Sequence, residues 1–280
     1  SAAGMLRLPA SAQSIRLGTW NVQFLNVEDT SGANRCCDNI EKRASKVAQR
    51  IKALDLDVIV LNEVFDDGER IALVDALKST YPSIVKNFYA NINLTNSGLM
   101  LFSKWPFETL PDPVHRAPPE QFFPPVSDGV VWNDVAFIEY DDSNGFGDSV
   151  ASKGVGLVRI RHPDNTVFTV AFSHTDAGDE PGDVTARRAQ MRDVKRIVED
   201  TLGTTRLRTE PIFIMGDLNI RGSHLKDRTE WTALFGNATT YENGFLRSPF
   251  HDAGECEARP FLRGAERDPG LTAGIWYQTE

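Results

Sequence analysis

The segment PIFIMGDLNI, residues 211–220, limits the possible folds most, because an apolar run ends there in a carboxylate and an amide two positions apart. Residues 212–215 have the composition of a buried β-strand. Side chains at positions i and i+2 of an extended chain point to the same side, so we expect Asp217 and Asn219 to project together while Leu218 turns back into the core. Asp and Asn at a strand end also stabilise turns, and this segment alone leaves the structural and the functional interpretation equally open.

Similar apolar runs alternate along the chain with segments of helical periodicity. Strands are predicted at residues 15–24, 57–64, 97–105, 135–140, 154–162, 166–175 and 212–215, and helices at residues 41–54, 69–77, 185–202 and 231–235. Helical spacing places Ala44, Val47, Ala48, Ile51 and Leu54 on the inner face of the first helix, and Ala189, Val194, Ile197 and Val198 on that of the third. The turn residues Pro163, Asp164 and Asn165 predict a hairpin. We therefore predict an α/β (α+β) fold of two packed mixed sheets with outer helices, as one domain over residues 1–280 with residues 1–14 as a tail.

The composition is that of an ordinary globular domain, with 41% hydrophobic and 25% charged residues. No apolar run approaches the roughly 20 residues needed to span a bilayer. A net charge of −9 disfavours a general nucleic-acid binder but not a nuclease, because a metal ion or a local basic patch can handle phosphates on an acidic protein. Cys36, Cys37 and Cys256 form no zinc pattern, and both a disulfide to Cys256 and three reduced thiols are open alternatives. The compartment is open too, with an extracellular location slightly favoured.

Four of the predicted strands carry polar residues at or near their ends. Asn21 follows an apolar approach, Glu63 stands where a buried strand should still be apolar, and His174 ends a third strand, as Asp217 and Asn219 end the fourth. A charged residue inside an apolar strand costs several kcal/mol unless it is paired or binds a metal ion. Glu63 is thus either a satisfied core carboxylate or a functional group, and we favour the second.

If these strand ends meet, they bring together two carboxylates, two amides and an imidazole. Such an oxygen-rich set suits Mg²⁺, with Mn²⁺ or Ca²⁺ as alternatives, and a divalent ion there would polarise a phosphoryl oxygen. Asp217 could then take the proton of an attacking water, while Asn219 and His174 donate to the phosphate. The set predicts metal-assisted hydrolysis of a phosphodiester.

The motifs TWNVQ, LNEV, SHTDA and GDLNI, in this order, resemble those of the endonuclease/exonuclease/phosphatase superfamily, which has the deoxyribonuclease I-like fold. The resemblance covers roughly residues 15–276 and implies a four-layer αββα sandwich. It implies that Glu63 is the main metal-binding carboxylate and that Asn21 supports the metal and the phosphate. It also implies that Asp217 orients or deprotonates the water, and that Asn219 and His174 stabilise the phosphate.

One branch of the superfamily, the neutral sphingomyelinases, fits best. DSVASKGVGLVRI, residues 148–160, is similar to its segment in which an Asp precedes a Lys-Gly pair, and RRAQMRDV, HDAGE and PGLTAG resemble further elements of that branch. By this resemblance Lys153 contacts the substrate phosphate and Asp148 positions Lys153. The alternative is that Lys153 is a solvated residue opening a strand.

The chain also departs from the family pattern. Members finish with a Ser-Asp-His strand, whereas this sequence stops at GLTAGIWYQTE. We expect either a natural chain about 40 residues longer or a protein that has lost the Asp-His pair. The other histidines, His115, His162, His224 and His251, stand in no such context. AGIWYQ also lacks the acidic residue and Asn that accompany choline-headgroup recognition, which leaves the headgroup open.

The leading hypothesis is a Mg²⁺-dependent phosphodiesterase of the sphingomyelinase type, a monomer acting on a phospholipid. Phe122 and Phe123, in PPEQFFPPV, form either a membrane-contact loop or a core-plugging loop. The alternatives are a metal-dependent nuclease and a non-catalytic binding protein. A nuclease would need a basic groove, whereas we expect the four arginines of one helix to form its solvated face. These are Arg187, Arg188, Arg192 and Arg196.

Overall fold

The computed structural model describes residues 15–24, 40–86, 88, 96–111, 115, 134–141, 152–220, 246–247 and 273–276. The first half of this part contains β1 (Leu17–Phe24), α1 (Ile40–Leu54), β2 (Val58–Val64), α2 (Asp67–Leu77), β3 (Ser83–Val85), β4 (Met100–Ser103) and β5 (Phe107–Glu108). The second half contains β6 (Val135–Glu139), β7 (Gly154–Arg161), β8 (Val167–His174), α4 (Pro181–Thr209), β9 (Ile212–Asp217), β10 (Leu246–Arg247) and β11 (Ala273–Trp276). The predicted helix at 231–235, the cysteines, Asp148, Phe122 and Phe123 lie outside the described residues.

The strands form two sheets. One has the order β1-β2-β4-β3, and the other has the order β10-β11-β9-β8-β7-β5, with β6 also paired to β7. Strands β1 and β2 are parallel, as are β8 and β9, while β7 and β8 form the antiparallel hairpin that the turn residues predicted. Both sheets therefore contain parallel and antiparallel pairs, as the alternation of helices and hairpins indicated.

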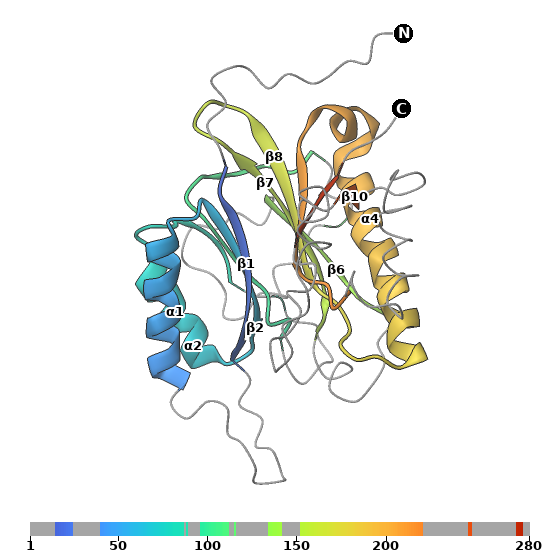
Figure 1. The fold of residues 1–280 in the computed structure, drawn as a ribbon. Helices are drawn as coiled ribbons and strands as arrows, with labels where there is room; N and C mark the ends of the chain where they lie inside the picture. The colour runs from blue at the N-terminus through green and yellow to red at the C-terminus, as the bar shows by residue number, and fades with distance from the viewer. Residues whose placement is uncertain are drawn as a thin grey trace, which may run out of the picture.

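The two sheets pack face to face, with α1 and α2 outside the first sheet and α4 outside the second (Figure 1). Three apolar clusters fill the spaces between the four layers: one beneath α1 and α2, one between the sheets, and one beneath α4. The predicted four-layer αββα fold is confirmed.

The helices bury the faces that their periodicity predicted. Four of the five inner positions expected for α1 are buried, but Leu54 is 43% exposed because it is the last residue of the helix. All four inner positions expected for α4 are buried. Helix α4 begins at Pro181 with a capping box between Glu180 and Asp183, which fixes where the chain enters the helix after β8. No helix in the described part of the chain combines the length and the hydropathy needed to cross a membrane.

The parallel pairs determine where the polar strand ends lie. Strands β1, β2, β8 and β9 all run in the same sense, so that their carboxyl ends meet at the lower edge of the molecule in Figure 1. The polar residues of the four motifs therefore come from both sheets and gather at one end of the space between them.

Candidate active site

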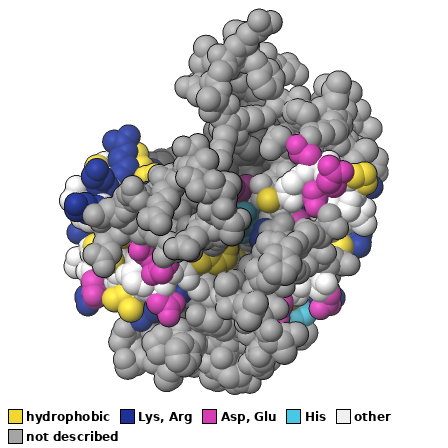
Figure 2. Space-filling model, turned by 90° about the horizontal axis from the view of Figure 1, so that it is seen from below, with side chains coloured by type: hydrophobic (Ala, Val, Ile, Leu, Met, Phe, Trp, Pro, Cys, Tyr) yellow, Lys and Arg dark blue, Asp and Glu magenta, His cyan; other side chains and the backbone are white. Residues whose placement is uncertain are grey.

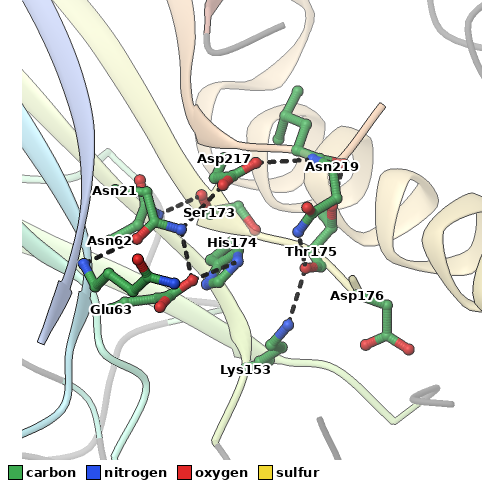
Figure 3. A network of polar contacts seen from close by, with 12 residues as sticks. Asn21, Asn62, Glu63, Lys153, Ser173, His174, Thr175, Asp176, Asp217 and Asn219 are labelled. Atoms are coloured by element: carbon green, nitrogen blue, oxygen red, sulfur yellow. Dashed lines mark hydrogen bonds and ion pairs between the residues drawn. The ribbon is translucent and has the colours of Figure 1, made fainter. Parts of the chain in front are cut away.

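Figure 2 shows this end of the molecule, where histidine, acidic and basic side chains are visible in a hollow near the middle of the face. The close-up in Figure 3 shows Asn21 and Glu63 from the first sheet facing His174 and Asp217 from the second. The structure thus brings together the strand-end residues that the sequence predicted to meet.

The side-chain amide of Asn21 bridges two carboxylates. Its Nδ2 donates to Glu63 Oε1 at 2.5 Å and to Asp217 Oδ2 at 3.0 Å, so one amide contacts an acid from each sheet. Its Oδ1 accepts from the backbone N–H of Gln23 at 3.1 Å, which fixes the orientation of the amide plane. Because both acids lie within hydrogen-bond distance of one nitrogen, negative charge from two strands is concentrated at one point.

The backbone of the first sheet is distorted where it presents these groups. Glu63 has a φ of 61° and Gln23 a φ of 54°, and the register of β1 against β2 shifts after Asn21. Such left-handed residues break the alternation of side chains along a strand and can turn a side chain toward a site. Arg43 of α1 donates to the carbonyl oxygen of Val22 at 2.7 Å and so holds this end of β1 in place. Glu63, whose side chain is 18% exposed, faces the site and is not a fully buried core carboxylate.

In the segment at residues 211–220, both the structural and the functional interpretation that the sequence left open apply. Asp217 Oδ1 accepts from the backbone N–H of Asn219 at 3.1 Å, which is a turn-stabilising contact, while Asp217 Oδ2 accepts from Asn21. Leu218 is fully buried, as predicted. The turn therefore also serves to present one carboxylate oxygen to the site.

The carbonyl oxygen of Thr175, just after β8, gathers two of the predicted phosphate donors. It accepts from Lys153 Nζ at 2.9 Å and from Asn219 Nδ2 at 2.9 Å. Lys153 is only 5% exposed, so the alternative of a solvated lysine opening a strand is wrong. Thr175 itself donates through its backbone N–H to the carbonyl oxygen of Asp217 at 3.1 Å and through its hydroxyl to that of Leu218. Sequence reasoning missed Thr175, although it stands next to His174 in a quoted motif.

His174 is 5% exposed and lies 3.9 Å, through Nε2, from Glu63 Oε1. Burial and, to a smaller extent, the neighbouring Lys153 ammonium lower the pKa of His174, Asp217 acts in the opposite direction, and the net result is a pKa of about 3. The imidazole is therefore neutral at pH 7 and can donate one hydrogen bond without carrying charge. Its Nδ1 has no hydrogen-bond partner among the described residues.

The loop after β8 is held by α4. Gln190 accepts from the backbone N–H of Asp176 and donates to its carboxylate, both at 2.9 Å, while Arg187 donates to the carbonyl oxygens of Asp176 and Gly178 at 3.0 and 2.7 Å. Arg187 is fully buried, so its prediction as part of a solvated face was wrong, because its guanidinium satisfies the backbone of this loop. The other three arginines, Arg188, Arg192 and Arg196, are exposed as expected.

Two other histidines lie on different parts of the second sheet and its surroundings. His162 follows β7 at the hairpin, at the opposite end of β8 from His174, where it pairs with Asp164 at 2.8 Å. His115 pairs with Asp200 of α4 at 2.7 Å. Neither histidine stands in a motif of the family, and the structure places neither in the polar network of Figure 3.

The donor set fits a hard divalent cation held by few protein ligands. Within the described residues there is no cluster of three His, Cys, Asp or Glu side chains that could form a closed metal cage. Instead, two carboxylates, Glu63 and Asp217, converge on one amide in a partly exposed place. Mg²⁺ keeps several of its waters and commonly binds one or two carboxylates, so it suits this arrangement better than Zn²⁺, which favours His and Cys.

Comparison with known proteins identifies the relatives of this chain. The model of the Endonuclease/Exonuclease/phosphatase family matches residues 18–254. Sphingomyelinase C 2 from Leptospira interrogans serogroup Icterohaemorrhagiae serovar Lai is 24% identical over 226 residues, which make up 75% of this chain and 31% of that protein. The chain thus matches about a third of the length of this curated relative.

Solved structures share the fold at low sequence identity. Sphingomyelinase C from Streptomyces griseocarneus superposes with a TM-score of 0.64 at 17% identity, covering 95% of this chain and 84% of that one. A beta toxin variant from Staphylococcus aureus with bound magnesium ions superposes with a TM-score of 0.61 at 16% identity, covering 96% of this chain and 87% of that one. The resemblance read from the four motifs is confirmed, and because the family model covers most of the sequence, the chain belongs to the endonuclease/exonuclease/phosphatase family.

Proposed function

We propose that this protein is a metal-dependent phosphodiester hydrolase that acts on a phospholipid in the manner of a sphingomyelinase, that is, with phospholipase C chemistry. The observation that carries the proposal is the amide of Asn21, which joins the carboxylates of Glu63 and Asp217 across the two sheets. The donors Lys153 and Asn219 share one acceptor beside these acids, and the neutral imidazole of His174 faces Glu63. Acids that can hold a cation and activate water thus stand next to donors for an anionic phosphate.

In the proposed reaction a water molecule attacks the phosphorus and the bond from phosphorus to the lipid oxygen breaks. Asp217 accepts a proton from the attacking water, and the lipid oxygen takes up a proton from solvent as it leaves. Because the bond to the lipid oxygen is the one that breaks, the phosphate stays on the headgroup. Lys153 and Asn219 turn from the Thr175 carbonyl to the phosphoryl oxygens, and His174 donates to them as a neutral group. A buried donor set of this kind stabilises the negative charge that builds up as the water attacks.

Glu63, with Asn21 beside it, would hold the divalent ion, for which we propose Mg²⁺. When bound there, such an ion supplies polarisation of a phosphoryl oxygen and charge compensation for the leaving oxygen. The Staphylococcus aureus beta toxin variant of the same fold, solved with bound magnesium ions, supports the choice of Mg²⁺.

The lipid substrate is supported by the relatives rather than by a described binding surface. The Leptospira interrogans relative and the Streptomyces griseocarneus neighbour are both sphingomyelinases by name. A membrane substrate would make extracellular action and peripheral membrane contact part of the same proposal, and the sequence PPEQFFPPV, with Phe122 and Phe123, is the segment to test for that contact.

The test is release of phosphocholine from sphingomyelin vesicles, run beside plasmid nicking, with Mg²⁺ and then with excess chelator. Glu63→Gln removes the charge of the proposed metal ligand and should lower release by about 100-fold or more. Glu108→Gln is the matched control, because Glu108 lies on β5 and is paired with Arg161 of β7, away from the polar network. Chelator-sensitive release that depends on Glu63 but not on Glu108 would establish the proposal. Nicking without release would assign the same residues to a nuclease, and inactivity in both assays would contradict the proposed function.

A further inference from the structure

The site is built from two sheets whose mutual packing is mostly non-directional. Asn21 and Glu63 belong to the first sheet, whereas His174 and Asp217 belong to the second. Between the sheets lies an apolar cluster that includes Val60 and Phe172. Apolar contacts depend mainly on buried area and only weakly on orientation, whereas a hydrogen bond constrains both distance and angle.

One fully buried hydrogen bond crosses between the sheets next to the site. Asn62 Nδ2 donates to the carbonyl oxygen of Ser173 at 2.9 Å, and both residues are completely buried (Figure 3). Asn62 directly precedes Glu63, and Ser173 directly precedes His174. This bond therefore joins the two strand positions from which the facing side chains of Glu63 and His174 emerge.

The accepting carbonyl is itself tightly enclosed. A Cβ atom on Gly216, which has a φ of 133°, would lie 1.8 Å from the Ser173 carbonyl oxygen. Only glycine at this position of β9 therefore leaves room for that oxygen. The Ser173 hydroxyl donates to the carbonyl oxygen of Gly154 at 2.9 Å, next to Lys153. The bond from Asn62 thus ends on a residue that is fixed against both neighbouring strands of the second sheet and cannot shift alone.

We propose that Asn62 is a positioning residue, which sets the separation and orientation of the Glu63 carboxylate relative to the His174 imidazole by clamping β2 to β8. Asn62 is fully buried, so we expect it to act through its neighbours. Its Oδ1 lies 3.4 Å from the Thr19 hydroxyl, which orients the amide so that Nδ2 faces the second sheet. This inference rests on the proposed function for its kinetic test, and on geometry alone for its structural test.

Asn62→Leu removes the donor at similar volume, and Asn62→Gln keeps an amide donor on a longer side chain. Tyr81→Phe is the matched control, because the Tyr81 hydroxyl also donates to a backbone carbonyl at 2.9 Å, that of Leu56, at the opposite end of β2. Asn62→Leu removes the bond to Ser173 and the longer contact with Thr19, whereas Tyr81→Phe removes one part-buried bond, so both should lower Tm by about 2–6 °C. Steady-state kinetics on sphingomyelin vesicles, corrected for the folded fraction and measured well below Tm, then separate positioning from stability.

For Asn62→Leu we expect kcat to fall by about 100-fold with KM changed by less than about threefold, because a misplacement near 1 Å has that effect on catalysis. Asn62→Gln should recover kcat to within about tenfold of the wild type, and Tyr81→Phe should leave kcat unchanged. Normal kcat in Asn62→Leu would overturn the proposal. So would an Asn62→Gln variant as slow as Asn62→Leu, since the loss would then follow disturbed packing rather than the missing donor.

A crystal structure of Asn62→Leu gives a readout that needs no turnover. The distance from Glu63 Oε1 to His174 Nε2, 3.9 Å here, should increase by about 1 Å. If the wild-type protein hydrolyses neither sphingomyelin nor plasmid DNA, the proposed function fails, and this distance alone decides the role of Asn62. An unchanged distance would show that Asn62 does not set the geometry of the site.

Discussion

Replacing Asn21 by leucine should destabilise the protein more when Glu63 is charged than when it is neutral. The Asn21 amide donates to Glu63 Oε1 at 2.5 Å and to Asp217 Oδ2 at 3.0 Å. Leucine has a similar volume but no donor, so in Asn21→Leu the two carboxylates face each other across the sheets without a group between them. The cost then has one part from lost hydrogen bonds and one part from repulsion.

The distances bound both parts. Two oxygens within 2.5 and 3.0 Å of one nitrogen are at most about 5.5 Å apart. Two unit charges at this distance repel by about 3 kcal/mol at an effective dielectric constant of 20 and by less than about 1 kcal/mol in bulk water. Glu63 is 18% exposed, so we take about 1–2 kcal/mol for repulsion. Hydrogen bonds to charged acceptors contribute about 1.5–3 kcal/mol each, and partial solvation of the acids brings the total expected cost to about 3 kcal/mol.

The assay is a double-mutant cycle by urea denaturation in excess chelator, which removes metal binding from the comparison. Asn21→Leu should cost about 3 kcal/mol in the wild-type background but about 1–2 kcal/mol less in the Glu63→Gln background, where the repulsion is absent. Thr169→Val is the control partner, because Thr169 is fully buried and donates to the Glu210 carboxylate at 2.5 Å at the far end of β8. Its coupling with Glu63→Gln should be near zero. A coupling between Asn21 and Glu63 below about 0.5 kcal/mol would refute the reasoning, because the two carboxylates would then not depend on the amide between them.

Three further changes test other parts of the structure by urea denaturation. Arg187→Met should lower the free energy of unfolding by about 3 kcal/mol, because the buried guanidinium donates to two backbone carbonyls. The control, exposed Arg188→Met, should change it by less than about 0.5 kcal/mol, and equal effects would contradict the buried role of Arg187. In excess chelator, stability should fall by about 2 kcal/mol between pH 6.5 and pH 5 through His174, because its folded pKa of about 3 lies below 6.5 and the unfolded chain binds more protons in that range. His174→Gln should lack this component, and identical pH slopes would disprove the assignment. Gly216→Ala should lower the free energy of unfolding by more than about 3 kcal/mol, since the added Cβ would meet a backbone oxygen of β8 at 1.8 Å. Gly203, with a φ of 64°, has open space around it, so Gly203→Ala should lower it by only about 1–2 kcal/mol. Similar losses in the two variants would contradict the close approach at Gly216.

The residues of the site that sequence could predict are those at the ends of parallel strands. Apolar runs identified β1, β2, β8 and β9, and parallel strands place their carboxyl ends at one edge, so Asn21, Glu63, His174 and Asp217 had to lie close if the strands were parallel. Lys153 came only from the family resemblance, because nothing in its local pattern distinguishes a buried lysine from a solvated one. Its burial depends on the Thr175 carbonyl, a partner on another strand.

Asn62 could not be assigned from the sequence because the backbone breaks the pattern there. Alternation along β2 predicts that Asn62 and Glu63 point to opposite sides of the sheet. The positive φ of Glu63 cancels this alternation, so that Asn62 reaches Ser173 and Glu63 reaches His174 on the same facing sheet. A left-handed glutamate has no local sequence signal, since the conformation is imposed by the tertiary structure.

Arg187, by contrast, had a usable signal. It stands seven residues before Val194 and four before Met191, which places it on the buried face of α4 with both of them. Grouping the four arginines by charge rather than by helical position led to the wrong prediction. The phase of a charged residue within the apolar period is therefore better evidence of its burial than its residue type.

The two ends of the first sheet use polar residues in different ways, and this difference decides how substitutions act. At the end away from the site, Lys104 pairs with Asp55 and Asp57 at 2.8 and 3.1 Å, and Arg16 also pairs with Asp55, so all of these groups belong to one sheet and its loops. The exposed pair of Arg16 and Asp55 contributes about 0–1 kcal/mol, and none of these pairs crosses to the second sheet. At the site end, Asn21 and Asn62 bond across to the second sheet. Substitutions at the first end should therefore act only through stability, whereas those at the second act through geometry, and a catalytic defect without loss of stability should map to the bonds that cross between the sheets.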